Sequence, residues 1–196
     1  MSSAGTLELR LGELLEEIAS ADPMPGSGFV AGFGVAMAAG LVSMAARLSR
    51  GHWAEASAVA AQAEKLRARA APLAEQNARV YRHALTTLKG NGDLGRASRD
   101  EQIASALDEA AWVPLQIAEV AADVTSLAAS VAERGDPSVR ADAVAAALLS
   151  HASARAAATL VEVNLGTTPT DERLVRARDV AGTAGMALER ALETVA

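Results

Sequence analysis

Apolar positions recur along this chain at the spacing of α-helices, and no segment shows the strict two-residue alternation of a half-buried strand. The clearest feature is a run without any charged side chain from Pro23 to Ala46. A helix of that kind is buried on nearly all sides or lies in a membrane. The pattern predicts an all-α fold, a bundle of five or six long, partly kinked helices.

Turns divide the chain into six predicted helical segments. They cover residues 7–19, 28–48, 54–88, 98–133, 137–163 and 169 to near the C-terminus. Pro72 and Pro114 fall inside two of them and predict a kink or a short break. Ser98, Asp136 and Thr168 stand where N-caps are expected, directly before helix-compatible residues.

The uncharged segment carries a ridge of small residues. Gly28, Gly32, Ala36 and Gly40 recur at four-residue spacing, which lets the backbone of another helix approach closely. The flanks of the segment lack a Lys/Arg bias and an aromatic belt. These features favour a buried central helix over a membrane span, so no membrane association is expected.

The composition fits one helical domain spanning residues 1–196. Hydrophobic residues make up 51% of the chain but aromatic residues only 3%, and alanine dominates. Alanine is the best helix former and fills little volume. A core of this kind needs wide helix contacts, a second subunit or a ligand to complete it. No shift in composition marks a second domain.

Charge and cysteine content narrow the function classes. The net charge of −6 comes from interspersed acidic and basic residues, which argues against nucleic acid as a partner. Cysteine is absent, so disulfides and thiolate catalysis are excluded. The N-terminal segment is acidic where an export signal would be basic. We therefore expect a cytoplasmic protein.

Common catalytic motifs are missing. The histidines lie far apart in sequence, at positions 52, 83 and 151, so no metal site is expected. The turn Pro23–Gly28 lacks the flanking residues of a nucleophile elbow and the Lys-Ser/Thr of a phosphate-binding loop. Taken alone, this turn is best interpreted as a tight connection between two packed helices.

Three polar residues stand out in otherwise apolar segments: Asn77, Asp142 and Asn164. Asp142 lies among alanines near a predicted helix start. Its carboxylate either interacts with the helix N-terminus or a nearby arginine, or it faces a cationic substrate in a cleft. The residues alone leave both interpretations open.

Four motifs, in order, resemble one known family. They are Pro23–Phe29, similar to Pro-x-Pro-Gly-Gly-Gly-Ser; Ala111–Leu115, similar to Ala-x-x-Pro-Leu; Gly135-Asp136-Pro137 followed by Ala141–Ala146, similar to Ser-Asp-Ala-Gly-Val-Ala; and Val163-Asn164-Leu165, similar to Ile-Asn-Leu. The family is the formiminotransferase-cyclodeaminase C-terminal family, which includes bacterial methenyltetrahydrofolate cyclohydrolases.

The chain also departs from the family pattern. Gly28 matches the third family glycine, but Ser27 replaces the second glycine and Phe29 the serine. Asn77 stands where an aspartate is usual and Leu160 where an asparagine is common. Arg47 likewise replaces a small polar residue.

The resemblance implies a homodimeric enzyme whose substrate is a tetrahydrofolate derivative, with no permanently bound cofactor and no metal. Family cyclohydrolases add water to the methenyl cation; cyclodeaminases close the ring and release ammonia. Both reactions need a partly dry pocket, proton transfer and negative charge near an amidinium-like carbon.

The resemblance also suggests roles for single residues. Asp142 is the expected catalytic carboxylate, and Asn77 is expected to orient the reacting groups. Asn164 and the backbone N–H groups of Gly26, Ser27 and Gly28 are expected to bind the substrate. Phe29 is expected at the pocket mouth.

Two alternatives remain. One is an enzyme of the same fold that acts on a different small imine or amidine. The other is a helical dimer without catalytic activity.

Overall fold

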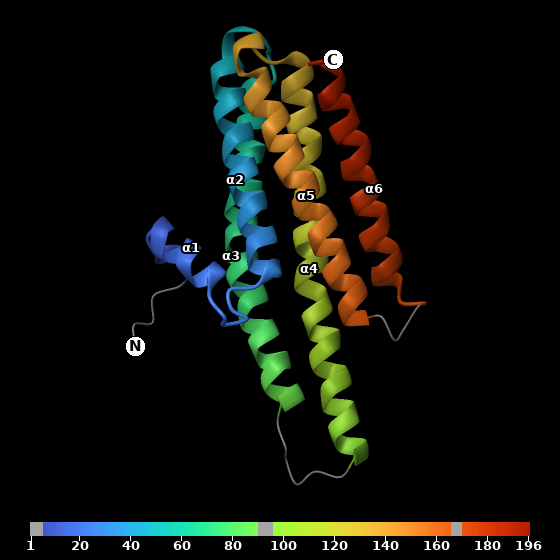
Figure 1. The fold of residues 1–196 in the computed structure, drawn as a ribbon. Helices are drawn as coiled ribbons and strands as arrows, with labels where there is room; N and C mark the ends of the chain where they lie inside the picture. The colour runs from blue at the N-terminus through green and yellow to red at the C-terminus, as the bar shows by residue number, and fades with distance from the viewer. Residues whose placement is uncertain (1–5, 90–95, 166–169) are drawn as a thin grey trace.

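The computed structural model describes residues 6–89, 96–165 and 170–196, which form helices joined by short connections (Figure 1). The α-helices are α1 (Leu11–Ala19), α2 (Ser27–Leu48), α3 (Ala56–Lys89), α4 (Arg96–Arg134), α5 (Arg140–Leu165) and α6 (Glu172–Glu193), with 3-10 turns at Thr6–Glu8, Ser49–Gly51 and Pro137–Val139. No strand occurs in the described ranges. The predicted all-α bundle of long helices is confirmed.

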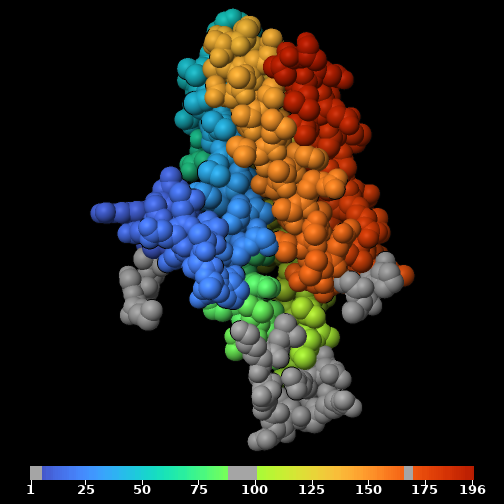
Figure 2. Space-filling view, viewed as in Figure 1, coloured from blue at the N-terminus to red at the C-terminus, as the bar shows by residue number. Residues whose placement is uncertain are grey.

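Helices α2 to α6 run side by side along the bundle, while α1 stands to one side of it (Figures 1 and 2). The core between them consists mainly of alanine and valine. Small side chains let the helix axes come close, so contact over long helices replaces the bulk that large side chains would supply.

The predicted ridge of small residues on α2 packs against α3. A Cβ atom added to Gly32 would lie 3.0 Å from both the Cα and the Cβ atom of Ala74, and one added to Gly28 would overlap the side chain of Asn77. Contacts this short leave no room for a larger residue. The two helices therefore approach at a separation that glycine sets.

We expect Gly32→Ala to destabilise the fold by about 1–3 kcal/mol, because the new methyl group meets the backbone of α3, which cannot move aside. Gly182→Ala on α6 is the matched control. Nothing lies within 4 Å of its added Cβ, so helix propensity should make it neutral or slightly stabilising. Urea unfolding at one protein concentration measures both. Equal stability of the two variants would contradict close packing of α2 on α3.

Several helix boundaries differ from those predicted. Helices α3 and α4 continue through Pro72 and Pro114 without a break. Helix α4 begins at Arg96, so Ser98 lies inside it and is not its N-cap. The last helix begins later than expected, with Asp171 as its N-cap; residues 166–169, which include Thr168, lie outside the described ranges.

Asp136 caps the turn before α5 as predicted, because its side chain accepts a hydrogen bond from the backbone N–H of Ser138 at 2.9 Å. The first helix is shorter than predicted. Of the apolar stripe on α1 only Leu14 is buried, whereas Leu11 and Leu15 are more than half exposed. Leu14 packs against α2 and α3, while the rest of this apolar face stays exposed.

In the part of the chain that the structure describes, three helical segments are long and apolar enough to cross a membrane by length and composition: Ser27–Gly51, Glu101–Arg134 and Pro137–Leu165. At least half of each apolar window is buried inside the bundle. Helices packed into a core of alanine and valine account for this hydropathy without a bilayer.

Candidate functional site

A cavity of about 300 Å³ lies where α2 begins and α5 ends. It draws its walls from the turn before α2 and from α3, α4 and α5. The lining residues are Pro23, Met24, Gly26, Ser27, Gly28, Asn77, Tyr81, Ala110, Pro114, Leu160, Val163 and Asn164. Five of the seven predicted site residues therefore meet in one place: Gly26, Ser27, Gly28, Asn77 and Asn164.

The first turn of α2 supplies hydrogen-bond donors to this cavity. Gly26 occupies the N-cap position, but it has no side chain that could accept a hydrogen bond from the first N–H groups of the helix. The first hydrogen bond of the helix runs from the Val30 N–H to the Gly26 carbonyl, at 3.1 Å. The N–H groups of the three residues between them have no partner within the helix. Such a turn can bind a substrate oxygen or an anionic group.

Asn77 reaches the cavity only because residue 28 is glycine. The Asn77 side chain occupies the space that a Cβ atom at Gly28 would fill. Only 9% of Asn77 is exposed, and its side chain lies on the cavity wall. A buried amide without a partner is unfavourable unless a ligand or water binds it. Asn77 is therefore available for a ligand in the cavity.

Asn164 is fixed by a proline on the neighbouring helix. Pro114 has no N–H, so the carbonyl of Ala110 lacks its usual partner within α4. The Nδ2 atom of Asn164 donates to that carbonyl at 2.9 Å. This bond orients the amide and leaves Oδ1 as an acceptor at the cavity wall.

Tyr81 lines the same cavity, and the sequence analysis did not single it out. It lies four residues after Asn77, one turn further along α3, and is the only tyrosine of the chain. The spacing from Asn77 was the available signal. Apart from this phenol, none of the described side chains that line the cavity is ionisable, so these residues contribute no carboxylate.

Phe29 does not lie at the pocket mouth. Its side chain is fully buried and packs with Leu14, Ala74 and Ala78. Its ring also stacks on Phe33, with ring centroids 6.0 Å apart. The residue after Gly28 points into the protein, since successive helical side chains lie about 100° apart. Phe29 therefore packs the start of α2 against α1 and α3.

Asp142 does not line the cavity. It lies in the first turn of α5, whereas Asn164 lies in the last turn. The helix rise of 1.5 Å per residue separates the two by about 33 Å. Figure 1 shows α5 beginning at the end of the bundle opposite to the start of α2. Within one chain, the expected carboxylate cannot reach the turn or Asn164.

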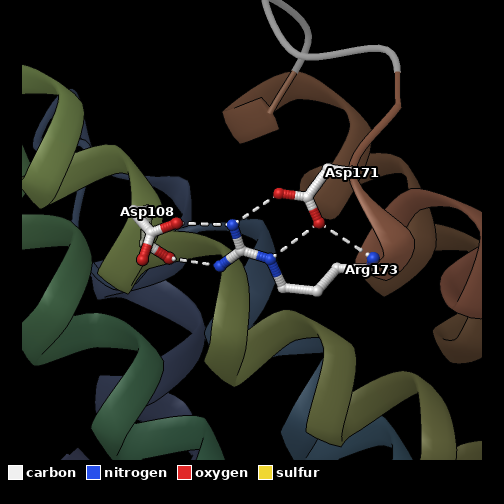
Figure 3. Close-up of polar contacts among 3 residues, drawn as sticks. All are labelled: Asp108, Asp171 and Arg173. Carbon is white, nitrogen blue, oxygen red and sulfur yellow. Dashed lines mark hydrogen bonds and ion pairs between the residues drawn. The ribbon is translucent and has the colours of Figure 1, made fainter.

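A second cavity of about 460 Å³ adjoins the first and shares Asn164 with it. Arg173 on its wall makes ion pairs with Asp171 and with Asp108 of α4 (Figure 3). The guanidinium also lies 5.2 Å from the ring centroid of Trp112. The cluster fastens the start of α6 to α4. Asp171 is the N-cap of α6 and Arg173 lies in its first turn, so the ion pair between them orients the start of this helix.

Hydrogen bonds from the Arg173 side chain and backbone lower the pKa of Asp171 to about 2. Because the pKa of Asp171 is lowered in the folded protein, its ionised carboxylate stabilises the fold at pH values above the ordinary pKa of about 3.8. This stabilisation is lost as the pH falls through 2. We expect Asp171→Asn, which keeps the cap, to be less stable than the wild type at neutral pH. The difference should shrink as the pH falls from about 4 and should vanish below pH 2.

Thermal unfolding across this pH range measures the effect. Glu119→Gln is the control, because its pair with Arg176 at 3.0 Å is more exposed and should contribute little. A stability difference for Asp171→Asn that persists below pH 2 would show that the charge of Asp171 is not its cause.

No group of three or more possible metal ligands is found among the described residues. His52 instead lies beside Asp136, with its Nδ1 atom 3.2 Å from a carboxylate oxygen. This pair joins the turn after α2 to the turn before α5, far from the cavity.

Comparison with known proteins agrees with the motifs. The family model described as formiminotransferase-cyclodeaminase matches residues 10–181. A methenyltetrahydrofolate cyclohydrolase from Methylorubrum extorquens is 33% identical over 193 residues, covering 92% of this chain and 93% of that protein. The crystal structure of formiminotetrahydrofolate cyclodeaminase from Thermotoga maritima superposes with a TM-score of 0.85 at 23% identity, covering 96% of both chains. The chain belongs to the formiminotransferase-cyclodeaminase family.

Proposed function

We propose that this protein is a folate one-carbon enzyme that hydrolyses methenyltetrahydrofolate to a formyltetrahydrofolate. The cyclohydrolase relative supports this choice over the cyclodeaminase reaction, since it is 33% identical to this chain whereas the cyclodeaminase structure is 23% identical. The observation that carries the proposal is the cavity at the start of α2, where Asn77 and Asn164 present amides between apolar walls. Such a pocket suits a flat heterocycle with a few polar edges.

In this reaction a water molecule attacks the carbon that bridges two nitrogens of the substrate. The water loses one proton as it adds to the carbon. One carbon–nitrogen bond then breaks, and the departing nitrogen takes the electron pair of that bond and the second proton of the water, which leaves a formyl group and one released proton. The amide oxygens of Asn77 and Asn164 can accept hydrogen bonds from the water and hold it beside the carbon. The N–H groups at the start of α2 can bind an oxygen of the substrate ring.

The substrate carries a delocalised positive charge that the cavity must tolerate. Amide oxygens and the face of the Tyr81 ring both present negative partial charge. The absence of Lys and Arg from the cavity wall removes repulsion. None of these steps uses a resident cofactor, so a tetrahydrofolate derivative enters as substrate only.

A direct assay tests the proposal. Purified protein is mixed with methenyltetrahydrofolate, and loss of the methenyl absorbance is followed beside a reaction without protein. We expect acceleration over the spontaneous rate. Ammonia release from formiminotetrahydrofolate, without accelerated methenyl hydrolysis, would instead assign the cyclodeaminase reaction. No turnover of either compound would overturn the proposal.

We further propose that the whole chain forms one domain that assembles as a cytoplasmic homodimer without nucleic acid or membrane partners. An apolar groove of about 610 Å³ between α2 and α5, adjoining α1, supports the dimer. Its walls include the partly exposed side chains of Val30, Met37 and Leu149. Exposed apolar faces of this extent mark interaction sites. Light scattering after size exclusion measures the assembly state.

A second candidate is an enzyme of this fold with another small imine or amidine as substrate. It is favoured by Asn77 and Leu160, since both line the cavity and both depart from the family pattern noted above. Calorimetry separates the two candidates. Binding of another metabolite without any binding of folate would favour the second, and binding of neither would favour a non-catalytic dimer.

A further inference from the structure

Asp142 lies on the exposed apolar face of α5. Asp142, Leu149, Ala156 and Val163 follow one another at seven-residue steps, which is close to two helical turns. Leu149 and Ala156 line the apolar groove, and Val163 lines the cavity. One face of α5 therefore leads from Asp142 at one end, along the groove, to the cavity at the other end.

The neighbouring helix shows the same pattern. Val30, Met37 and Met44 recur at seven-residue steps along α2, and they are 42%, 47% and 39% exposed. The groove between the two helices also includes Gly26 and Ser27, which line the cavity. A second copy of the chain packed on this face would lie directly beside the cavity.

We propose that the partner subunit completes the active site with its Asp142. The two copies would pack face to face about a two-fold axis that crosses α5 near its middle. Helix α5 would then run antiparallel to its counterpart. The partner subunit's Asp142 would meet the cavity end of α5, and the same contact would recur at the other site. This inference rests on the proposed hydrolysis of a cationic substrate.

Electrostatics favour this arrangement over the parallel one. A two-fold axis along the helices would place the two Asp142 carboxylates close together, and like charges repel. The antiparallel arrangement instead places each carboxylate beside a cavity that has no charged side chain and that receives a cation. Asp142 is partly exposed in the first turn of α5, so its carboxylate is accessible to a partner.

Asp22 is a carboxylate of the same chain that directly precedes the cavity-lining Pro23. It lies beside Pro23, but its Oδ1 atom accepts a hydrogen bond from the Met24 N–H at 3.0 Å, and it lines the groove rather than the cavity. Asp142 at the bridging carbon would accept the proton that the attacking water loses and would offset the positive charge of the substrate. Asp22 would do neither.

Mixed dimers test the inference. Asp142→Asn removes the carboxylate and keeps the cavity, whereas Gly28→Ala disturbs the cavity and keeps Asp142. Each pure dimer should lose activity at least about 100-fold. A dimer purified through two different tags, one on each variant, contains one complete site out of two. We expect it to recover about half the wild-type activity. Glu133→Gln, the control, removes an exposed carboxylate that pairs with Arg190 between α4 and α6 and should leave turnover unchanged.

A crosslinking measurement is independent of folate chemistry and is possible because the chain has no cysteine. In the variant Asp142→Cys/Val163→Cys the two thiols lie about 32 Å apart within one chain. A short bismaleimide should therefore join subunits and not link one chain to itself. Val163→Cys alone should give little dimer.

The outcomes separate the two hypotheses. Inactive wild-type protein together with crosslinked dimers would overturn the proposed function and leave the subunit geometry standing. Full activity of Asp142→Asn, or no recovery in the mixed dimer, would overturn the inference. So would efficient crosslinking of either single variant, Asp142→Cys or Val163→Cys, because the antiparallel arrangement keeps identical positions of the two subunits far apart.

Discussion

Gly28→Ala should lower kcat/KM for methenyltetrahydrofolate by about 100-fold while the protein stays folded. The added methyl group would overlap the amide of Asn77, which must then leave its position. Asn77 is the flexible partner in this contact, so the side chain yields before the helices separate. It can yield only toward the cavity, where it would occupy space that the substrate needs.

The size of the effect follows from geometry. A displacement of about 1 Å in a catalytic group can cost a factor of about 100 in rate. Gly12→Ala on α1 is the matched control, since nothing lies within 4 Å of its added Cβ. Steady-state kinetics and thermal unfolding should be measured on both variants. Unchanged kcat/KM in Gly28→Ala would show that the position of Asn77 does not matter for turnover.

A second substitution can show where the effect originates. Asn77→Gly in the Gly28→Ala background removes the overlapping amide. If the blocked cavity is the main defect, substrate binding should recover in the double variant while kcat stays low. Recovery of both substrate binding and kcat would show that Asn77 affects turnover only through the space that it occupies.

The parts of the site that lie close together in sequence could be predicted from it. Gly26, Ser27 and Gly28 form a local motif, so the turn can be recognised in the sequence without knowing how the helices pack. Asn77 and Asn164 stand out because an amide in an apolar helix needs a partner. The predicted family was confirmed by the match to residues 10–181.

The parts that depend on helix phase and register could not be predicted. Phe29 follows the turn directly, yet its side chain points away from the cavity. Tyr81 and Ala110 reach the cavity only because α3 and α4 pack with one particular offset. Asp142 resembles a site residue in sequence, but α5 carries it to the far end of the bundle. The order of the motifs along the chain does not show how far apart they lie in the folded protein.

Asn164→Ala should destabilise the fold by about 1–3 kcal/mol and lower turnover by about 100-fold, for two different reasons. The stability loss arises because the carbonyl of Ala110 loses its donor in a buried place. The loss of turnover arises because the cavity loses an acceptor. A single substitution cannot separate the two.

Pro114→Ala separates them, because it restores an N–H group one helical turn after Ala110. In that background the Ala110 carbonyl keeps a partner within α4, so Asn164→Ala should cost less than about 0.5 kcal/mol. The coupling between positions 114 and 164 should then be about 1–2 kcal/mol, measured by urea unfolding of the four proteins at one concentration. Turnover should stay low in the double variant, since alanine offers no side-chain oxygen. If stability and turnover recovered together, Asn164 would act only as a helix support, whereas an unchanged stability cost would show that Pro114 does not create the need for it.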